Sequence, residues 1–145
     1  MAVQANIRPA RAGDAFALAD LSAQLGYVVD ADEIAERLAR VRAQGMGEVF
    51  VAEVDARVVG WTHVVPRLQL EDPAHAELAG LVVAEGARGA RVGAALLAAA
   101  EGWARAQRFT LLRVRSNVVR ERAHRFYERA GYCRVKQQAV FHKSI

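Results

Sequence analysis

The sequence predicts a mixed α/β fold in which helices cover a central β-sheet. Two observations lead to this prediction: strand-like and helix-like runs alternate along the chain, and turn or capping residues bound most of these runs. The chain has 145 residues, of which 53% are apolar and 25% charged, so it can build one hydrophobic core. We therefore expect a single domain over residues 1–145.

The expected elements follow one another with short connections. In chain order they are a strand over 3–8, a helix from Asp14 to about Leu25, a helix between Asp30 and Gly45, strands over 48–54, 57–66 and 76–84, a helix over 91–107, a strand over 109–116, a helix over 117–130, and one or two closing strands over 132–144.

The two N-terminal helices are predicted from their caps and their apolar spacing. Asp14 and Asp30 are residues that favour helix N-caps, and Glu33 completes a capping box with Asp30. Gly26 and Gly45 end the two helices. Apolar residues recur on one face of each helix: Leu18, Leu21 and Leu25 in the first, and Ile34, Leu38 and Val41 in the second.

The central and C-terminal segments show the apolar spacing of strands in some runs and that of helices in others. Residues 48–54 and 57–66 are rich in β-branched residues and are joined by the turn Asp55-Ala56. The helix over 91–107 follows from one apolar face, and Gly131 fits the C′ position of the last helix. Residues 67–75 are expected to form a loop.

Composition excludes several classes of protein. The net charge of +4 fits an anionic ligand as well as nucleic acid, and no Lys/Arg block or nucleic-acid motif is present, so we expect no nucleic-acid partner. The sequence has no run of eighteen apolar residues, so we expect no membrane span. The first residues lack the features of a signal peptide, and the single cysteine, Cys133, rules out an intrachain disulfide; both favour the cytoplasm. Cys133 itself is expected to be a half-buried strand residue rather than a nucleophile.

A glycine-containing turn, Glu85-Gly-Ala-Arg-Gly-Ala-Arg-Val-Gly93, joins a predicted strand to a predicted helix. Glycines let a backbone approach a ligand, and a helix N-terminus offers free N–H groups and a favourable dipole, so the turn suits a pyrophosphate. It lacks the Gly-Lys-Ser/Thr of a P-loop and the spacing of a dinucleotide fingerprint. Taken alone, such a turn is more often simple turn chemistry.

A second block adds specificity. It starts at Asn117 and continues with Ala123, Phe126, Tyr127, Glu128, Gly131 and Tyr132. Together the two stretches resemble the Gcn5-related N-acetyltransferase (GNAT) family. Its loop pattern, Arg/Gln-x-x-Gly-x-Gly/Ala, matches Arg88 to Gly93 with Arg91 at the middle glycine. Its other pattern, Asn-x-x-Ala-x-x-Phe/Leu-Tyr-Glu-x-x-Gly-Phe, matches the second block with three more residues between Asn117 and Ala123.

The resemblance implies a GNAT-like acyl-CoA N-acyltransferase fold with a mostly antiparallel central sheet and helices on both faces. It implies acetyl-CoA as co-substrate and a primary amine, on a small molecule or a protein, as acceptor. The amine would attack the thioester directly. The alternative is a CoA-binding protein of this fold with little or no transferase activity, in a regulatory or sensing role. Family members often form homodimers, and nothing in this chain fixes the oligomeric state.

The resemblance also assigns cofactor contacts. The strand before the loop would bind pantetheine through backbone groups, the loop and helix start would bind the pyrophosphate, and an asparagine after the next strand can touch the cofactor. The Arg91 N–H can still bind phosphate, while its side chain either adds a charge contact or crowds the loop. In this chain the assigned residues are Leu81, Val82, Val83, Arg88, Gly89, Ala90, Arg91, Val92, Gly93, Ala94 and Asn117.

Two residues are the catalytic candidates. By resemblance, Tyr127 would protonate the departing CoA thiolate as a general acid; the other interpretation is a core aromatic residue. Glu77 would deprotonate the amine, although a carboxylate there can also bind a cationic substrate or stay solvated. His63 and His75 are alternative bases. Asn117 can instead cap the helix, and no metal-ligand spacing is present.

Overall fold

The structure is a computed structural model that describes residues 4–87 and 91–145. The chain forms two compact units, the first ending at Val114 and the second spanning Arg115–Ile145, and each is described by itself. In chain order the helices and strands are β1 (Asn6–Pro9), a 3₁₀ turn (Ala12–Asp14), α1 (Ala15–Ala23), α2 (Ala31–Ala43), β2 (Glu48–Val54), β3 (Arg57–Arg67), β4 (His75–Val83), a 3₁₀ turn (Glu85–Ala87), α3 (Val92–Ala106), β5 (Leu112–Val114) and α4 (Glu121–Arg129).

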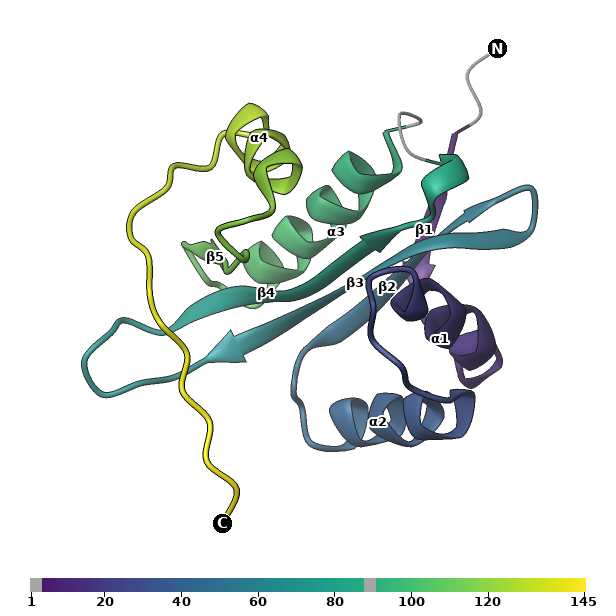
Figure 1. Ribbon diagram of the computed structural model, residues 1–145, viewed down its shortest axis with the longest axis horizontal. Helices are drawn as coiled ribbons and strands as arrows, with labels where there is room; N and C mark the ends of the chain where they lie inside the picture. Colours follow the sequence, from purple (N-terminus) through teal and green to yellow (C-terminus); the bar gives the residue numbers. More distant parts are fainter. Residues whose placement is uncertain (1–3, 88–90) are drawn as a thin grey trace. The chain divides into compact units, whose positions relative to one another are not determined.

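The first unit is built on a five-stranded sheet in the order β1-β2-β3-β4-β5 (Figure 1). The first three neighbouring pairs are antiparallel, and β4 pairs with β5 in parallel. Helix α3 connects β4 to β5, which is the crossover that a parallel pair requires. The expected mixed and mostly antiparallel sheet is therefore confirmed.

The hairpin between β2 and β3 has the predicted turn. Asp55 and Ala56 both have positive φ, at 50° and 63°. Positive φ at both central residues is the signature of a type I′ turn, whose twist matches that of the flanking strands. The turn sets the hairpin register, in which Val54 lies opposite Arg57.

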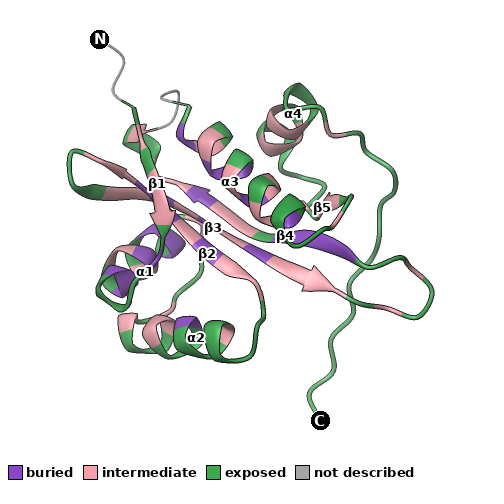
Figure 2. Cartoon of the chain, turned by 180° about the vertical axis from the view of Figure 1, so that it is seen from behind, coloured by how far each residue is buried: buried purple, intermediate pink, exposed green. Residues whose placement is uncertain are grey.

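Helices cover both faces of the sheet in the first unit (Figure 1). Helix α3 packs on one face, where Val92 and Leu96 join Ala52 in a buried cluster. Helices α1 and α2 pack on the other face, and Leu18 and Leu38 are buried in the cluster there. Figure 2 shows the buried residues concentrated along the strands and the sheet-facing sides of α1 and α3.

The N-terminal helices begin near the predicted residues, but only Asp30 caps its helix, since Asp14 makes no capping hydrogen bond to α1. The Asp30 carboxylate accepts a hydrogen bond from the Glu33 N–H at 2.8 Å and caps α2. Arg8 of β1 donates two hydrogen bonds to Asp14, at 2.8 and 2.9 Å, and also pairs with Glu53 of β2. This bidentate ion pair ties the start of α1 to the edge of the sheet.

Two elements are shorter than predicted. The strand expected over 109–116 spans only Leu112–Val114, because the end of α3 takes up the residues before it: the Phe109 N–H bonds to the Ala104 carbonyl at 2.9 Å, and Arg108 has φ 68°. The last helix starts at Glu121 rather than 117. The reason is a turn in which the Asn117 carbonyl accepts the Arg120 N–H at 3.0 Å.

The predicted closing strands over 132–144 are wrong: residues 132–145 carry no strand. A strand needs a partner for its backbone groups, and the structure gives this segment none in the second unit. Its apolar side chains Val135, Val140 and Phe141 are exposed as a result. Cys133 is likewise exposed rather than half-buried. In the described residues, no helix is long and apolar enough to cross a membrane.

Candidate active site

The ladder of strand β4 changes at Ala79. On the β3 side, Gly80 lies opposite His63 but Leu78 lies opposite Val64, so Ala79 is an extra residue, a β-bulge. On the other side, the described pairing with β5 ends at Leu78. Beyond the bulge, β4 therefore continues next to β3 without a paired β5 beside it.

Among the residues that the structure describes, this part of β4 has a strand partner on one side only. The Ala84 N–H donates to the Val59 carbonyl of β3 at 2.8 Å. Because backbone groups alternate along a strand, those of Leu81 and Val83 point away from β3, toward the side that β5 no longer covers. The Val82 groups point toward β3. Of the three residues predicted to bind pantetheine, Leu81 and Val83 thus have the backbone geometry for it.

Helix α3 begins shortly after this strand. Its first hydrogen bond runs from the Ala95 N–H to the Arg91 carbonyl at 3.0 Å. The N–H groups of Val92, Gly93 and Ala94 therefore have no partner within the helix, and they carry the positive end of its dipole. The predicted loop residues Arg88, Gly89 and Ala90 lie outside the described residues.

Arg91 holds an unusual backbone conformation at the helix start. Its φ and ψ are 60° and 19°, in the left-handed region, and its side chain makes no capping hydrogen bond. This conformation costs a residue with a Cβ about 1 kcal/mol of conformational free energy, whereas glycine adopts it freely. The side chain of Arg91 is exposed.

Glu77 lies on β4 before the bulge and is 9% exposed. It pairs with Val65 of β3, so its side chain shares the sheet face that α1 and α2 cover. Its carboxylate lies 4.0 Å from the Arg67 Nε. The carboxylate is thus held on this face by a cation at its outer end.

The alternative bases have different surroundings. His75 is 2% exposed, and its Nδ1 lies 3.0 Å from the Pro73 carbonyl, so its ring is buried. His63 Nε2 lies 3.3 Å from the Met46 carbonyl. A carbonyl can only accept, so this nitrogen carries the proton and the lone pair of the neutral ring is at Nδ1. Burial lowers the pKa of His63, which favours that neutral form.

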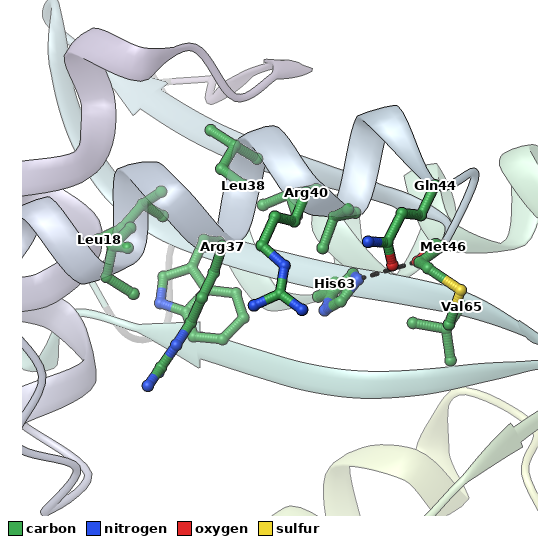
Figure 3. A pocket seen from close by; sticks show the side chains of 12 residues that line it. Leu18, Arg37, Leu38, Arg40, Gln44, Met46, His63 and Val65 are labelled. Atoms are coloured by element: carbon green, nitrogen blue, oxygen red, sulfur yellow. Dashed lines mark hydrogen bonds between the residues drawn. The ribbon is translucent and has the colours of Figure 1, made fainter.

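A pocket of about 490 Å³ lies between α2 and the sheet (Figure 3). Such a volume is within the range of about 300–1,000 Å³ that is common for small-molecule sites. Figure 3 shows Arg37 and Arg40 extending from α2 over the pocket, which His63 of β3 also lines. The lining residues are Leu18, Ile34, Arg37, Leu38, Arg40, Val41, Gln44, Met46, Val49, Trp61, His63 and Val65.

Sequence reasoning did not find this pocket. The alternation of Trp61, His63 and Val65 along β3 was a usable signal, because it puts three lining side chains on one face of the strand. The depth of the space depends on how closely α2 approaches the sheet, which the residue pattern does not encode.

Tyr127 lies on α4 of the second unit. Its ring packs edge-to-face against Phe126 and Tyr132, with centroids 5.1 and 6.0 Å apart. Burial raises the pKa of the phenol above its ordinary value of 10.0, and the positive charge of Arg120 opposes this shift. The hydroxyl therefore keeps its proton at neutral pH, as a general acid must.

Asn117 does not cap α4, whose N-cap is Arg120. Its side-chain oxygen accepts the Val119 N–H at 3.2 Å, and its carbonyl accepts from the Arg120 N–H at 3.0 Å and pairs with His124 Nε2 at 2.9 Å. These bonds form an Asx turn before the helix. The prediction that Asn117 caps the helix is therefore wrong.

A family model described as the acetyltransferase (GNAT) family matches residues 17–132, which is most of the chain. The chain belongs to the GNAT family. The cofactor of this family is acetyl-CoA, as predicted. Comparison with curated proteins gave no match.

Solved structures show the same fold. The chain superposes on an aminoglycoside N-acetyltransferase, AAC(6')-Iy in complex with CoA, with a TM-score of 0.88 at 15% identity, covering 100% of this chain and 98% of that one. Glucosamine-6-phosphate N-acetyltransferase from Arabidopsis thaliana gives 0.82 at 17% identity, covering 97% and 99%. A structure titled transcriptional regulator, from Bacillus halodurans C-125, gives 0.84 at 21% identity, covering 96% and 99%. At these identities the likeness establishes the fold alone.

Membership in the GNAT family gives the backbone of Arg91 a meaning. The family's loop pattern places glycine at this position, and the observed left-handed conformation is one that glycine adopts without strain. At the helix start this chain therefore has a backbone conformation that suits glycine while carrying a larger residue there. The cost falls on the backbone of Arg91.

Proposed function

We propose that this GNAT protein transfers the acetyl group of acetyl-CoA to a primary amine, on a small molecule or a protein. The amine nitrogen attacks the thioester carbonyl, the C–N bond forms and the C–S bond breaks. The amine loses a proton to a base, and the CoA thiolate takes up a proton from an acid. The observation that carries the proposal is the free backbone side of β4 beyond Ala79, followed by the open N-terminus of α3.

The donor site follows from that geometry. The backbone groups of Leu81 and Val83 would bind the pantetheine arm, and a backbone N–H of this stretch would stabilise the oxyanion of the thioester carbonyl. The N–H groups of Val92, Gly93 and Ala94 would bind the pyrophosphate, together with Arg88, Gly89, Ala90 and Arg91. Asn117 remains a candidate contact to the cofactor.

We propose Tyr127 as the general acid and Glu77 as the general base. The raised pKa of Tyr127 keeps its proton available for the thiolate. Glu77 lies on the sheet face that borders the pocket, one strand from Val65, and this position suits proton transfer from an amine bound there. His63, inside the pocket with its neutral form favoured, is the competing base.

The test of the acid is Tyr127→Phe with Tyr132→Phe as the matched control. Tyr132 is in the same ring cluster, and phenylalanine is what the family pattern has there, so the control should keep its activity. CoA release is followed with saturating amine, and acetyl-CoA binding is measured by calorimetry. We expect Tyr127→Phe to lower kcat by about 10²-fold or more with unchanged acetyl-CoA affinity. Equal kcat in both variants would remove Tyr127 from the mechanism.

The base is identified by comparing Glu77→Gln with His63→Gln. Loss of the general base should lower kcat/KM by about 10²–10⁴-fold and remove the acidic limb of the pH profile. We expect this from Glu77→Gln. If only His63→Gln removes the acidic limb of the pH profile, the base is His63.

A second candidate function, CoA binding with little or no transfer, is favoured by one observation. Arg91 replaces the family's loop glycine in a left-handed conformation at the helix start. If the arginine crowds the pyrophosphate, Arg91→Gly should bind acetyl-CoA more tightly than the parent and raise CoA release. Unchanged binding and undetectable transfer in both proteins would support the non-enzymatic alternative.

A further inference from the structure

The charged groups that line the pocket under α2 are of one sign. Arg37 and Arg40 contribute guanidinium groups, and no Asp or Glu is among the lining residues. Both arginines reach from α2 across the opening, as Figure 3 shows. A site of this kind attracts carboxylate or phosphate groups, which guanidinium binds in a bidentate manner.

We propose that this pocket binds the acetyl acceptor, and that the acceptor is an amine with an apolar body and an anionic carboxylate or phosphate group. The inference rests on the proposed acetyl transfer, and it adds the class of substrate. Arg37 and Arg40 would hold the anionic group at the mouth, and the amine would lie toward β4.

The interior of the pocket accounts for the apolar body. Between the two arginines and the sheet the lining is aliphatic and aromatic: Leu18, Ile34, Leu38, Val41, Val49, Trp61 and Val65. The indole of Trp61 is held in place by close packing, since a Cβ at Gly80 of the next strand would lie 2.8 Å from two of its ring carbons. A flat or branched apolar group thus has a rigid wall to pack against.

The floor of the pocket borders the proposed donor site. Three lining residues of β3 lie opposite β4 in the register: Trp61 faces Val82, His63 faces Gly80, and Val65 faces Glu77. Neighbouring strands are about 5 Å apart. An amine at the β3 side of the pocket is therefore one strand from the bulged part of β4 and from the Glu77 carboxylate.

The arginines are available to a ligand. Among the described residues, Arg40 has no ion pair. Within the described part of the chain, Arg37 pairs with Glu33 alone, one turn away at 3.6 Å. Both side chains are more than half exposed, so an anion can compete for Arg37. The other carboxylates at the start of α2 do not line the pocket. A polycationic amine would meet two like charges here.

The experiment uses three amines that differ in one group: 4-(aminomethyl)benzoate, its phosphonate counterpart 4-(aminomethyl)phenylphosphonate, and 4-methylbenzylamine, which carries a methyl group in place of the anion. Binding to the whole chain is measured by calorimetry without acetyl-CoA, in the parent and in Arg40→Gln. Arg105→Gln is the control, since it removes the same charge from α3, on the other face of the sheet, and Arg105 does not line the pocket.

We expect at least one anionic amine to bind about tenfold more tightly than 4-methylbenzylamine, which is the effect of one charge-assisted hydrogen bond. The preference should vanish in Arg40→Gln and persist in Arg105→Gln. The anion with the larger preference, carboxylate or phosphonate, is the preferred one. Equal or weaker binding of both anionic amines in the parent would overturn the proposal, as would an equal loss in both variants.

CoA release on adding acetyl-CoA then separates this proposal from acetyl transfer. Transfer to 4-methylbenzylamine without any preference for the anionic amines would support acetyl transfer and refute the proposed class of acceptor. Arginine-dependent binding without CoA release from any of the three amines leaves an anion-binding pocket and refutes its role as an acceptor site.

Discussion

Helices α3 and α2, on opposite faces of the sheet, differ in how completely they fill the space between helix and sheet. Helix α3 buries five residues, and Val92 and Leu96 are at most 1% exposed. Helix α2 on the opposite face buries only Leu38 and stands above a pocket of about 490 Å³. Both helices carry an apolar stripe, but the residues beside it differ. Small and apolar residues continue around α3, whereas arginines flank Leu38 on α2. Helix α3 is thus closely packed on its face of the sheet, whereas α2 leaves a pocket on the other face.

The largest contrast should come from truncating one side chain on each face. Leu96→Ala removes a fully buried side chain and should lower the free energy of unfolding by about 2–5 kcal/mol. Ile34→Ala widens an existing pocket and should cost less than about 1.5 kcal/mol. Denaturant unfolding of both variants checks this. Similar losses would mean that the two faces are equally packed.

The ion pair that fixes α1 beside the pocket face should come next. Asp14→Asn weakens the pair with Arg8, whose side chain is 17% exposed, and should cost about 1–3 kcal/mol. The hydrogen bonds from Arg8 lower the pKa of Asp14 below 3.8, the value expected in the unfolded chain. Their stabilisation is therefore complete above that value and is lost as pH falls through the lower folded pKa. Stability measured from pH 7 to pH 2 should fall less steeply in Asp14→Asn than in the parent.

A methyl group at Gly80 tests the rigid wall of the pocket. The new Cβ would lie 2.8 Å from Cη2 and Cζ3 of Trp61, so the indole must shift. We expect Gly80→Ala to cost about 1–2 kcal/mol and to change the fluorescence of Trp61. The chain has two tryptophans, so Trp103→Phe leaves Trp61 as the sole source of the signal. An unaltered spectrum and stability would show that the Trp61 side chain can shift at no cost, so that it is not a rigid wall.

The smallest effect is expected at the start of α3. Arg91→Gly relieves a left-handed conformation with φ 60°, while glycine adds entropy to the unfolded chain. The net result should be a gain of about 0.5–1 kcal/mol in unfolding free energy. A matched change at an unstrained arginine, Arg105→Gly within α3, should destabilise instead. A loss of stability in Arg91→Gly would mean that the arginine side chain makes compensating contacts.

Local signals in the sequence predicted most of the first unit. The Asp30 cap, the Asp55-Ala56 turn and the strand over residues 48–54 all lie where predicted, because each depends on neighbouring residues alone. The closing strands were wrong because a strand depends on a partner elsewhere in the chain, which the pattern of residues 132–144 does not specify.

The candidate site likewise has parts that local sequence signals predicted and parts that they did not. Motifs indicated the start of α3 and Tyr127, since these follow from residue types at fixed spacing. The bulge at Ala79 and the pocket under α2 were not predicted, because they arise from the pairing of β3 with β4 and from the height of α2 above the sheet. Arg37 and Arg40 look like ordinary charged residues on a solvated helix until the pocket beneath them is seen.

The most direct test of the division between a donor edge and an acceptor face is a pair of ¹⁵N–¹H correlation titrations on the parent protein. Acetyl-CoA should shift the amide signals of Leu81, Val83 and Gly93 and leave those of Arg37 and Arg40 in place, whereas 4-(aminomethyl)benzoate should do the reverse. If acetyl-CoA instead shifts the α2 signals and leaves β4 and the start of α3 unchanged, the account of this site is wrong.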